Sequence, residues 1–175
     1  MEQKLITNAD LRREFLRHAV ATLAYRGGKT LRDTPKNFGE LLIGETTRTP
    51  LEILYHISSL LKWALLLARG ESGWQDLPPR PWEGEVERFF EELKRLDDYL
   101  ASAAPLGNPP EKIFQGPIAD AHIHVGQMAM LRRLAGSPVR GENYFKADIV
   151  IGRVGPEQSS IRSEFDWLPK RGGKK

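Results

Sequence analysis

The segment between Thr49 and Gly70 constrains the fold more than any other, because it predicts a helix that is apolar on nearly all sides. Thr49 can cap the helix, Pro50 suits its first position, and Glu52 can complete a capping box. Arg69 and Gly70 place a cation in the last turn and a glycine just beyond it, as at many helix ends. A helix this apolar must be covered on several faces, by the rest of the chain or partly by a second subunit.

Three further segments show the three- and four-residue spacing of apolar side chains that is typical of amphipathic helices. They cover about residues 7–34, 83–103 and 117–134. In the first of these segments, Thr7 or Asn8 can cap the helix, and the glycine pair at 27–28 can end or bend it. The apolar face predicted for this helix consists of Leu11, Phe15, Ala19 and Leu23.

Four helices with moderate connections and no convincing strand pattern predict an all-α fold, an up-down-type four-helix bundle. The length of 175 residues is that of one domain with a substantial hydrophobic core, so we assign residues 1–175 to a single helical bundle domain. The bundle core covers about residues 8–136. Residues 137–175 form an irregular C-terminal tail that packs over the bundle. Its candidate anchors are Phe165, Trp167 and Leu168.

Composition restricts the chemistry and the location of the protein. The chain has no cysteine, which excludes disulfides, thiolate zinc sites and a cysteine nucleophile and fits a reducing compartment. Residues 1–7 lack the apolar core of a signal peptide. The longest apolar stretch, residues 60–68, is interrupted by Lys62 and is far too short to cross a bilayer. We therefore expect a cytoplasmic protein without a membrane partner.

The positive charge of the chain is modest and unevenly distributed. The formal net charge is +3, and basic residues are concentrated at the C-terminal end, Lys170–Lys175. No aromatic residue lies among them, which favours a solvated terminus over a nucleic-acid-binding arm. Elsewhere the basic residues are scattered among carboxylates, so we expect no nucleic-acid partner.

The strongest candidate for a functional site combines Asp120 and His124 with a distant histidine, His56. Residues four apart on a helix lie on one face, so the Asp120 carboxylate and the His124 imidazole can point at the same object. A carboxylate on the inner face of a bundle costs free energy unless it is paired, hydrogen-bonded or bound to a metal. Together with His56, the pair would suit a divalent metal with open coordination positions. The alternative is a hydrogen-bonded aspartate–histidine pair without a metal.

Other polar residues near this site receive weaker assignments. His122 is two residues from His124, so we read it as exposed or interfacial and exclude it from the site. Gln127 can orient a ligand through a hydrogen bond. His18 could serve as a fourth ligand or a general base if it faces the interior, although a hydrogen-bonded core histidine is the simpler interpretation. The arginines that could bind an anion, or simply form solvated helix faces, are Arg17, Arg26, Arg132 and Arg133.

Two short motifs resemble the DinB/YfiT-like (damage-inducible) superfamily of four-helix-bundle metalloenzymes. Residues 120–132 resemble the fourth-helix signature of that family, and residues 49–56 resemble the start of its second helix. The resemblance implies metal ligation by one histidine of the second helix and a His-x-x-x-His pair of the fourth. His56 and His124 match two of these ligands. Asp120 stands in the place of the remaining histidine, and a carboxylate can also ligate a divalent metal.

The resemblance covers about residues 8–136 and also implies properties of the whole protein. Members of the family are frequently homodimers, and characterised relatives include thiol-dependent transferases and isomerases that use low-molecular-weight thiols. The first functional hypothesis is therefore a divalent-metal-dependent enzyme acting on a small-molecule substrate. It would be either an S-transferase or isomerase with a thiol cosubstrate, or a hydrolase. Zinc or nickel is the expected metal, with manganese or iron as alternatives.

The second hypothesis is a non-catalytic, stress-related helical bundle that acts as a dimeric binding or sensor module. In that case the histidines and the aspartate form a structural network, and an apolar face of the helix after Thr49 serves dimerisation. A metal with an accessible open position would favour the enzyme, whereas a closed hydrogen-bonded site would favour the module.

Overall fold

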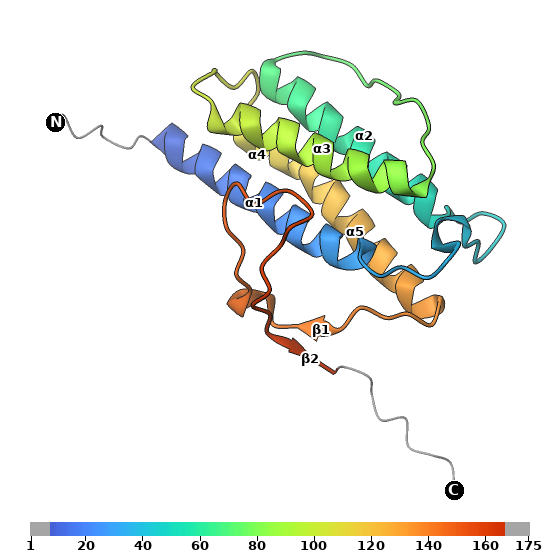
Figure 1. Ribbon diagram of the computed structural model, residues 1–175. Helices are drawn as coiled ribbons and strands as arrows, with labels where there is room; N and C mark the ends of the chain where they lie inside the picture. Colours follow the sequence, from blue (N-terminus) through green and yellow to red (C-terminus); the bar gives the residue numbers. More distant parts are fainter. Residues whose placement is uncertain (1–7, 167–175) are drawn as a thin grey trace, which may run out of the picture.

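The computed structural model describes residues 8–166, and most of them belong to four long helices that form a bundle (Figure 1). The long helices are α1 (Asn8–Leu31), α2 (Pro50–Arg69), α3 (Trp82–Ala101) and α5 (Ala119–Leu134). A short helix α4 (Pro110–Ile113) and a π-helical turn (Phe114–Ile118) lead directly into α5. Smaller elements are the 3₁₀ turns Phe38–Glu40 and Tyr144–Lys146 and the antiparallel pair of two-residue strands β1 (Gly141–Glu142) and β2 (Glu164–Phe165). The predicted all-α four-helix bundle with an irregular C-terminal region is confirmed.

The long connection between α2 and α3, residues 70–81, makes these two helices parallel (Figure 1). The C-terminal ends of α2 and α3 lie close together. Gly107 follows α3, and its backbone N–H donates to the carbonyl of Ala68, near the end of α2, at 2.8 Å. The Arg13 guanidinium at the start of α1 donates to the Ser102 carbonyl just after α3 at 2.6 Å, so α1 runs antiparallel to α3. The helix directions in chain order are therefore up, down, down and up. α1 and α2 each pack against both α3 and α5.

α2 occupies the core of the bundle, and its ends form as predicted. The Thr49 hydroxyl accepts a hydrogen bond from the Glu52 backbone N–H at 3.3 Å, and the Glu52 carboxylate accepts one from the Thr49 backbone N–H at 2.7 Å. Gly70 ends the helix with a φ of 79°. By length and composition alone α2 could cross a membrane, but 61% of its most apolar window is buried inside the bundle, as expected of a core helix.

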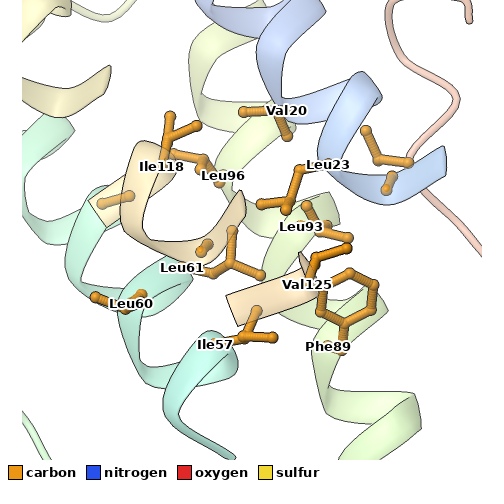
Figure 2. Close-up of a cluster of buried hydrophobic side chains, with 14 of the residues drawn as sticks. Val20, Leu23, Ile57, Leu60, Leu61, Phe89, Leu93, Leu96, Ile118 and Val125 are labelled. Carbon is orange, nitrogen blue, oxygen red and sulfur yellow. The ribbon is translucent and has the colours of Figure 1, made fainter. Parts of the chain in front are cut away.

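The hydrophobic core contains side chains from all four long helices (Figure 2). Its largest fully buried side chains include Leu16, Leu23, Leu54, Ile57, Leu61, Phe89, Leu93, Leu96, Ile118 and Met128. Burying a side chain of this size contributes roughly 1.5–3 kcal/mol relative to leaving it in water. The summed burial therefore fixes how the four helices pack, and with it the place where α2 and α5 meet.

α1 differs from the sequence-based expectation in two ways. It continues without a break through Gly27 and Gly28 to Leu31. Its buried face is also rotated, because Leu11 and Phe15 are 59% and 66% exposed. The apolar side chains that α1 buries are Leu16, Ala19, Val20, Ala21, Leu23, Ala24, Tyr25 and Leu31, which include the predicted Ala19 and Leu23. This face follows from the position of α1 against α3 and α5, which the spacing of apolar residues along α1 does not specify by itself.

Two buried polar clusters attach α5 and the C-terminal region to α1. Arg132, expected to be an anion binder or a solvated residue, is instead 4% exposed and donates to the Thr30 carbonyl at 3.0 Å. Lys29 pairs with Glu142 of β1 at 2.6 Å and with Glu164 of β2 at 3.0 Å. Because a buried charge without a partner is costly, these contacts hold α5 and the two strands in place.

The C-terminal region is anchored differently from the sequence-based expectation. Phe165 lies in β2 and is 45% exposed, so it is not a buried anchor. Val154 is buried in the main hydrophobic cluster instead. The other two candidate anchors, Trp167 and Leu168, and the basic residues 170–175 lie outside the described residues.

The contact between Gly27 of α1 and Phe89 of α3 generates a first prediction. A β-carbon at position 27 would lie 2.5 Å from Cζ of the buried Phe89 ring. We expect Gly27→Ala to destabilise the protein by about 1–3 kcal/mol through overpacking, despite the better helix propensity of alanine. Urea unfolding followed by circular dichroism measures this change in the free energy of unfolding.

Gly28→Ala is the matched control for this variant. Its β-carbon would lie 3.4 Å from Cζ of Phe90, an ordinary contact distance. This variant should be at least as stable as the parent, with a gain of up to about 1 kcal/mol from helix propensity. Equal destabilisation of the two variants would show that the close approach of Phe89 is not the reason for a glycine at position 27.

Candidate metal site

Helices α2 and α5 pack against each other and bring three candidate ligands together. His56 lies in the second turn of α2, while Asp120 and His124 lie one turn apart on α5. The chain enters α5 through a kink, at which Gly116 has a ψ of −106° and Pro117 follows it. Because proline has no N–H to donate, it interrupts the helical hydrogen bonds just before Asp120. The predicted helix start at Pro117 is this kink, whereas helical structure begins earlier, in α4.

The three side chains have the spacing of metal ligands. The ligand atoms of His56, Asp120 and His124 all lie within 4.8 Å of one another. One Asp120 oxygen lies 3.5 Å from Nε2 of His124, and the other lies 3.8 Å from Nε2 of His56. Bonds of about 2.0–2.2 Å in a tetrahedral site separate neighbouring donor atoms by about 3.4 Å, so small side-chain movements would close this set around an ion. Two imidazoles and one carboxylate therefore fit a divalent metal with open positions.

Gln127 favours this arrangement over a direct hydrogen bond between Asp120 and His124. Nδ1 of His124 lies 2.8 Å from Oε1 of Gln127. In this amide orientation Nδ1–H donates to Gln127, so Nε2 of the neutral ring keeps its lone pair. That lone pair faces an Asp120 oxygen at 3.5 Å, a distance longer than an N–H···O hydrogen bond. A cation between these two electron-rich atoms would satisfy both. Gln127 thus lies where the sequence analysis predicts an orienting hydrogen bond.

The site lies at the rim of the bundle rather than in its centre. The Asp120 side chain is 45% exposed, and the two imidazoles are half-buried. The sequence predicts a costly carboxylate on the inner face of the bundle. At this exposure, however, the free-energy cost of burying the Asp120 carboxylate is small. The feature that points to a site is instead the closeness of this carboxylate to two imidazoles. The same exposure leaves the site open to water and small molecules.

The surroundings of His56 lower its pKa below the ordinary value. Burial is the main cause. The neighbouring His124 imidazole and the positive charge of Arg48 act in the same direction, because both disfavour a second positive charge on His56, while the Asp120 carboxylate opposes them. The neutral imidazole is the form that ligates a metal. This environment therefore favours the ligating form of His56 near neutral pH.

Trp74, in the connection between α2 and α3, covers one side of the site. Its ring lies 5.8 Å from the His56 ring at an interplanar angle of 38°, and 5.9 Å from the Trp63 ring. The Tyr55 hydroxyl donates to the Leu77 carbonyl at 3.0 Å and so ties this loop to α2. Only the folded path of the long α2–α3 connection brings Trp74 to His56, so no local sequence pattern could have identified it.

An open groove of about 430 Å³ adjoins the site on the side of His124. Its lining residues are Thr47, Arg48, Ile53, His124, Gln127, Met130 and Leu131. Arg48 could have been recognised as a site residue from the sequence, because it directly precedes the helix cap Thr49. A residue at that position is held close to the first turns of the helix that carries His56.

The two other histidines lie outside the site. His122 is not part of the cluster, as predicted, but it is half-buried rather than exposed. Its Nδ1 lies 2.8 Å from the Ile118 carbonyl, and burial lowers its pKa. His18 is exposed on α1. It is therefore neither the core histidine nor the additional ligand that the sequence analysis considered.

The two candidate arginines of α1 make contacts within the chain. Arg17 pairs with Asp97 of α3 at 2.9 Å. The Arg26 guanidinium lies over the Tyr144 ring at 4.4 Å. Both side chains therefore attach α1 to its neighbours, and neither contributes to the candidate metal site.

The arrangement can hold a cation and keep a coordination position accessible from the rim. No protein-family model, curated protein or solved structure matches this chain. The assignment of the site therefore rests on the geometry of His56, Asp120 and His124. The resemblance of residues 49–56 and 120–132 to the DinB/YfiT-like superfamily stays an expectation.

The lowered pKa of His56 predicts that the stability of the metal-free protein depends on pH. The unfolded chain takes up the His56 proton near the ordinary value of about 6.5, whereas the folded protein takes it up only at lower pH. The stability that the neutral ring contributes is complete above the unfolded value and is lost as the pH falls below it. We expect His56→Gln to reduce the loss of stability between about pH 7 and about pH 5.

Urea titrations across this pH range, with a chelator present, measure the difference between parent and variant. NMR titration of the parent gives the pKa of His56 directly. His18→Gln controls for the removal of a histidine as such, because His18 is exposed and outside the site. The same pH dependence in the parent and in His56→Gln would contradict the assigned surroundings of His56.

Proposed function

We propose that this protein binds one divalent metal ion through His56, Asp120 and His124 and is a metal-dependent enzyme acting on a small molecule. The observation that carries the proposal is the convergence of two imidazoles and one carboxylate from α2 and α5 at ligand spacing. Three protein ligands with one position left for water or substrate are typical of catalytic zinc sites, whereas structural zinc sites are closed. The rim location of the site supports access to such a position.

Each residue of the site has a definite task in this proposal. The neutral rings of His56 and His124 provide lone pairs, and Gln127 holds the His124 ring in the ligating tautomer. The Asp120 carboxylate neutralises part of the charge of the ion. Trp74 covers one side of the His56 ring and limits its contact with water. The bound metal would lower the pKa of a water or thiol ligand and so supply a nucleophile at neutral pH.

Two reaction classes remain open, an S-transferase or isomerase that uses a low-molecular-weight thiol, and a hydrolase. Because the chain has no cysteine, a thiol would have to come from a cosubstrate. The resemblance to the DinB/YfiT-like superfamily supports the thiol-dependent class. Zinc or nickel suits the donor set, and manganese or iron is the alternative. We place the protein in the cytoplasm, in keeping with a chain free of cysteine.

One observation favours the second candidate, a non-catalytic dimeric binding or sensor module. An apolar groove of about 440 Å³ lies between α1 and α4, with Leu11, Phe15 and Phe114 exposed along it. Exposed apolar surface of this kind often marks a contact with another chain. This groove would suit a homodimer contact better than α2, which α3 and α5 cover. The two candidates differ in whether the site holds a metal with an accessible open position.

Metal analysis of protein purified without a histidine tag tests the proposal. We expect about one equivalent of a divalent metal per chain. His124→Ala and His56→Ala should lose this metal and remain helical, because each removes one ligand at the rim rather than a core side chain. Elemental analysis and circular dichroism measure the two properties.

His122→Ala is the matched control, because His122 lies on the same helix and outside the cluster. It should keep the metal content of the parent. Parental metal binding in both His56→Ala and His124→Ala would contradict the assigned ligands. A parent that holds no metal and takes up none on titration would contradict the metal proposal and favour the binding module.

Gln127 provides a separate test of how His124 is oriented. Gln127→Leu removes the acceptor for Nδ1–H, so we expect the affinity for zinc to fall about 10–100-fold. Competition with a chromophoric chelator measures this affinity. Gln127→Glu keeps an acceptor and should stay closer to the parent. Equal affinities in the parent and in Gln127→Leu would show that this hydrogen bond does not orient the ligand.

A further inference from the structure

The groove beside the metal site contains the guanidinium of Arg48. Its charge acts on the Glu52 carboxylate, but that carboxylate is hydrogen-bonded to Thr49 rather than to Arg48. Arg48 is exposed, and it makes no hydrogen bond or ion pair with any residue in the described range 8–166. Several other arginines are engaged within the chain, such as Arg17 with Asp97 and Arg132 with Thr30. Arg48 is thus available for an anion that comes from outside the chain.

The rest of the groove is mainly apolar. Ile53 and Leu131 are buried beneath it, while Met130 is 57% exposed along it. A volume of about 430 Å³ lies within the usual range of small-molecule pockets, roughly 300–1,000 Å³. Apolar walls with one charged group fit a ligand that has a hydrocarbon body and one acid group.

The groove and the metal site share two side chains. His124 and Gln127 line the groove. Nδ1 of His124 is hydrogen-bonded to Gln127, and Nε2 of the same ring faces Asp120. The charge of Arg48 also acts on His56, so the guanidinium lies close to both parts. A ligand that pairs with Arg48 and extends past His124 would reach the metal site.

We propose that the groove binds a small organic acid whose acid group pairs with Arg48, whose apolar body lies over Ile53 and Leu131, and whose other end reaches the metal site. This inference rests on the proposed metal site and names the class of substrate or cosubstrate for it. Arginine recognises a carboxylate or a related acid group through its fork of N–H donors. A neutral analogue of the same shape therefore binds more weakly.

The test uses the full chain loaded with cobalt(II), because a thiolate bound to cobalt gives a charge-transfer absorption band. The probes are mercaptocarboxylates of increasing chain length and their primary amides, which keep the thiol and the shape but not the charge. We expect the carboxylate of the best-fitting length to bind about fivefold more tightly than its amide at low ionic strength. Added salt should reduce this preference.

Three variants show whether Arg48 causes the preference. Arg48→Gln should bind the carboxylate and the amide equally, with unchanged cobalt content and unchanged affinity for the amide. Arg48→Lys keeps the charge and should keep part of the preference. Arg69→Gln is the matched control, because Arg69 is an exposed arginine at the opposite end of α2, and it should behave as the parent.

The outcomes separate this inference from the metal proposal. If the parent binds no cobalt, both fall. If the parent binds cobalt but shows no preference for the carboxylates, or if Arg48→Gln keeps the full preference, the inference is wrong and the metal proposal stands. A preference that disappears in Arg48→Gln and persists in Arg69→Gln supports the inference.

Discussion

The burial of α2 is the constraint on which the rest of the structure depends. Its apolar side chains face in several directions, so no single neighbour could remove them from water. α3 and α5 cover it on two sides, and α1 completes the bundle by packing against those two helices. His56 lies on the part of α2 that meets α5, so the packing that covers the apolar helix also places its imidazole beside Asp120 and His124. The three candidate ligands therefore project from closely packed helices, which limits how far they can move.

Two polar clusters on α2 and its neighbours differ in a way that bears on function. On the α3 side, Glu85 and Arg88 form an ion pair at 3.1 Å, and both side chains are almost completely buried. This pair is closed to solvent, and burial raises the pKa of the Glu85 carboxyl above its ordinary value. At the α5 rim, the donor atoms of His56, Asp120 and His124 face one another and the site is open. The Glu85–Arg88 pair balances its own charge, although both Glu85 carboxylate oxygens and Nη1 of Arg88 lack a hydrogen bond among the described residues. The cluster at the α5 rim is open to solvent and could take up a cation.

Local rules were sufficient to predict the parts of the fold that depend on nearby residues. The capping box of Thr49 and Glu52 and the glycine end of α2 form as predicted, and the four-residue spacing places Asp120 beside His124. The buried face of α1, the hydrogen bond from Arg132 to the Thr30 carbonyl and the position of Trp74 could not be predicted in this way. Each depends on which helix or loop lies opposite, and that arrangement follows from the packing of the whole chain.

The carboxylate in the candidate site links the two binding events that we propose. Without a metal, the negative charge of Asp120 opposes an anion near His124 and partly cancels the attraction of Arg48. A divalent ion bound to one carboxylate and two neutral imidazoles leaves a local charge of about +1, so the ion and Arg48 then attract the same anion. Because such coupling is reciprocal, an organic acid in the groove would strengthen metal binding by the factor by which the metal strengthens binding of the acid. With a carboxylate ligand, metal binding would change the local charge from about −1 to about +1, so the site would pass from repelling an anion to attracting one.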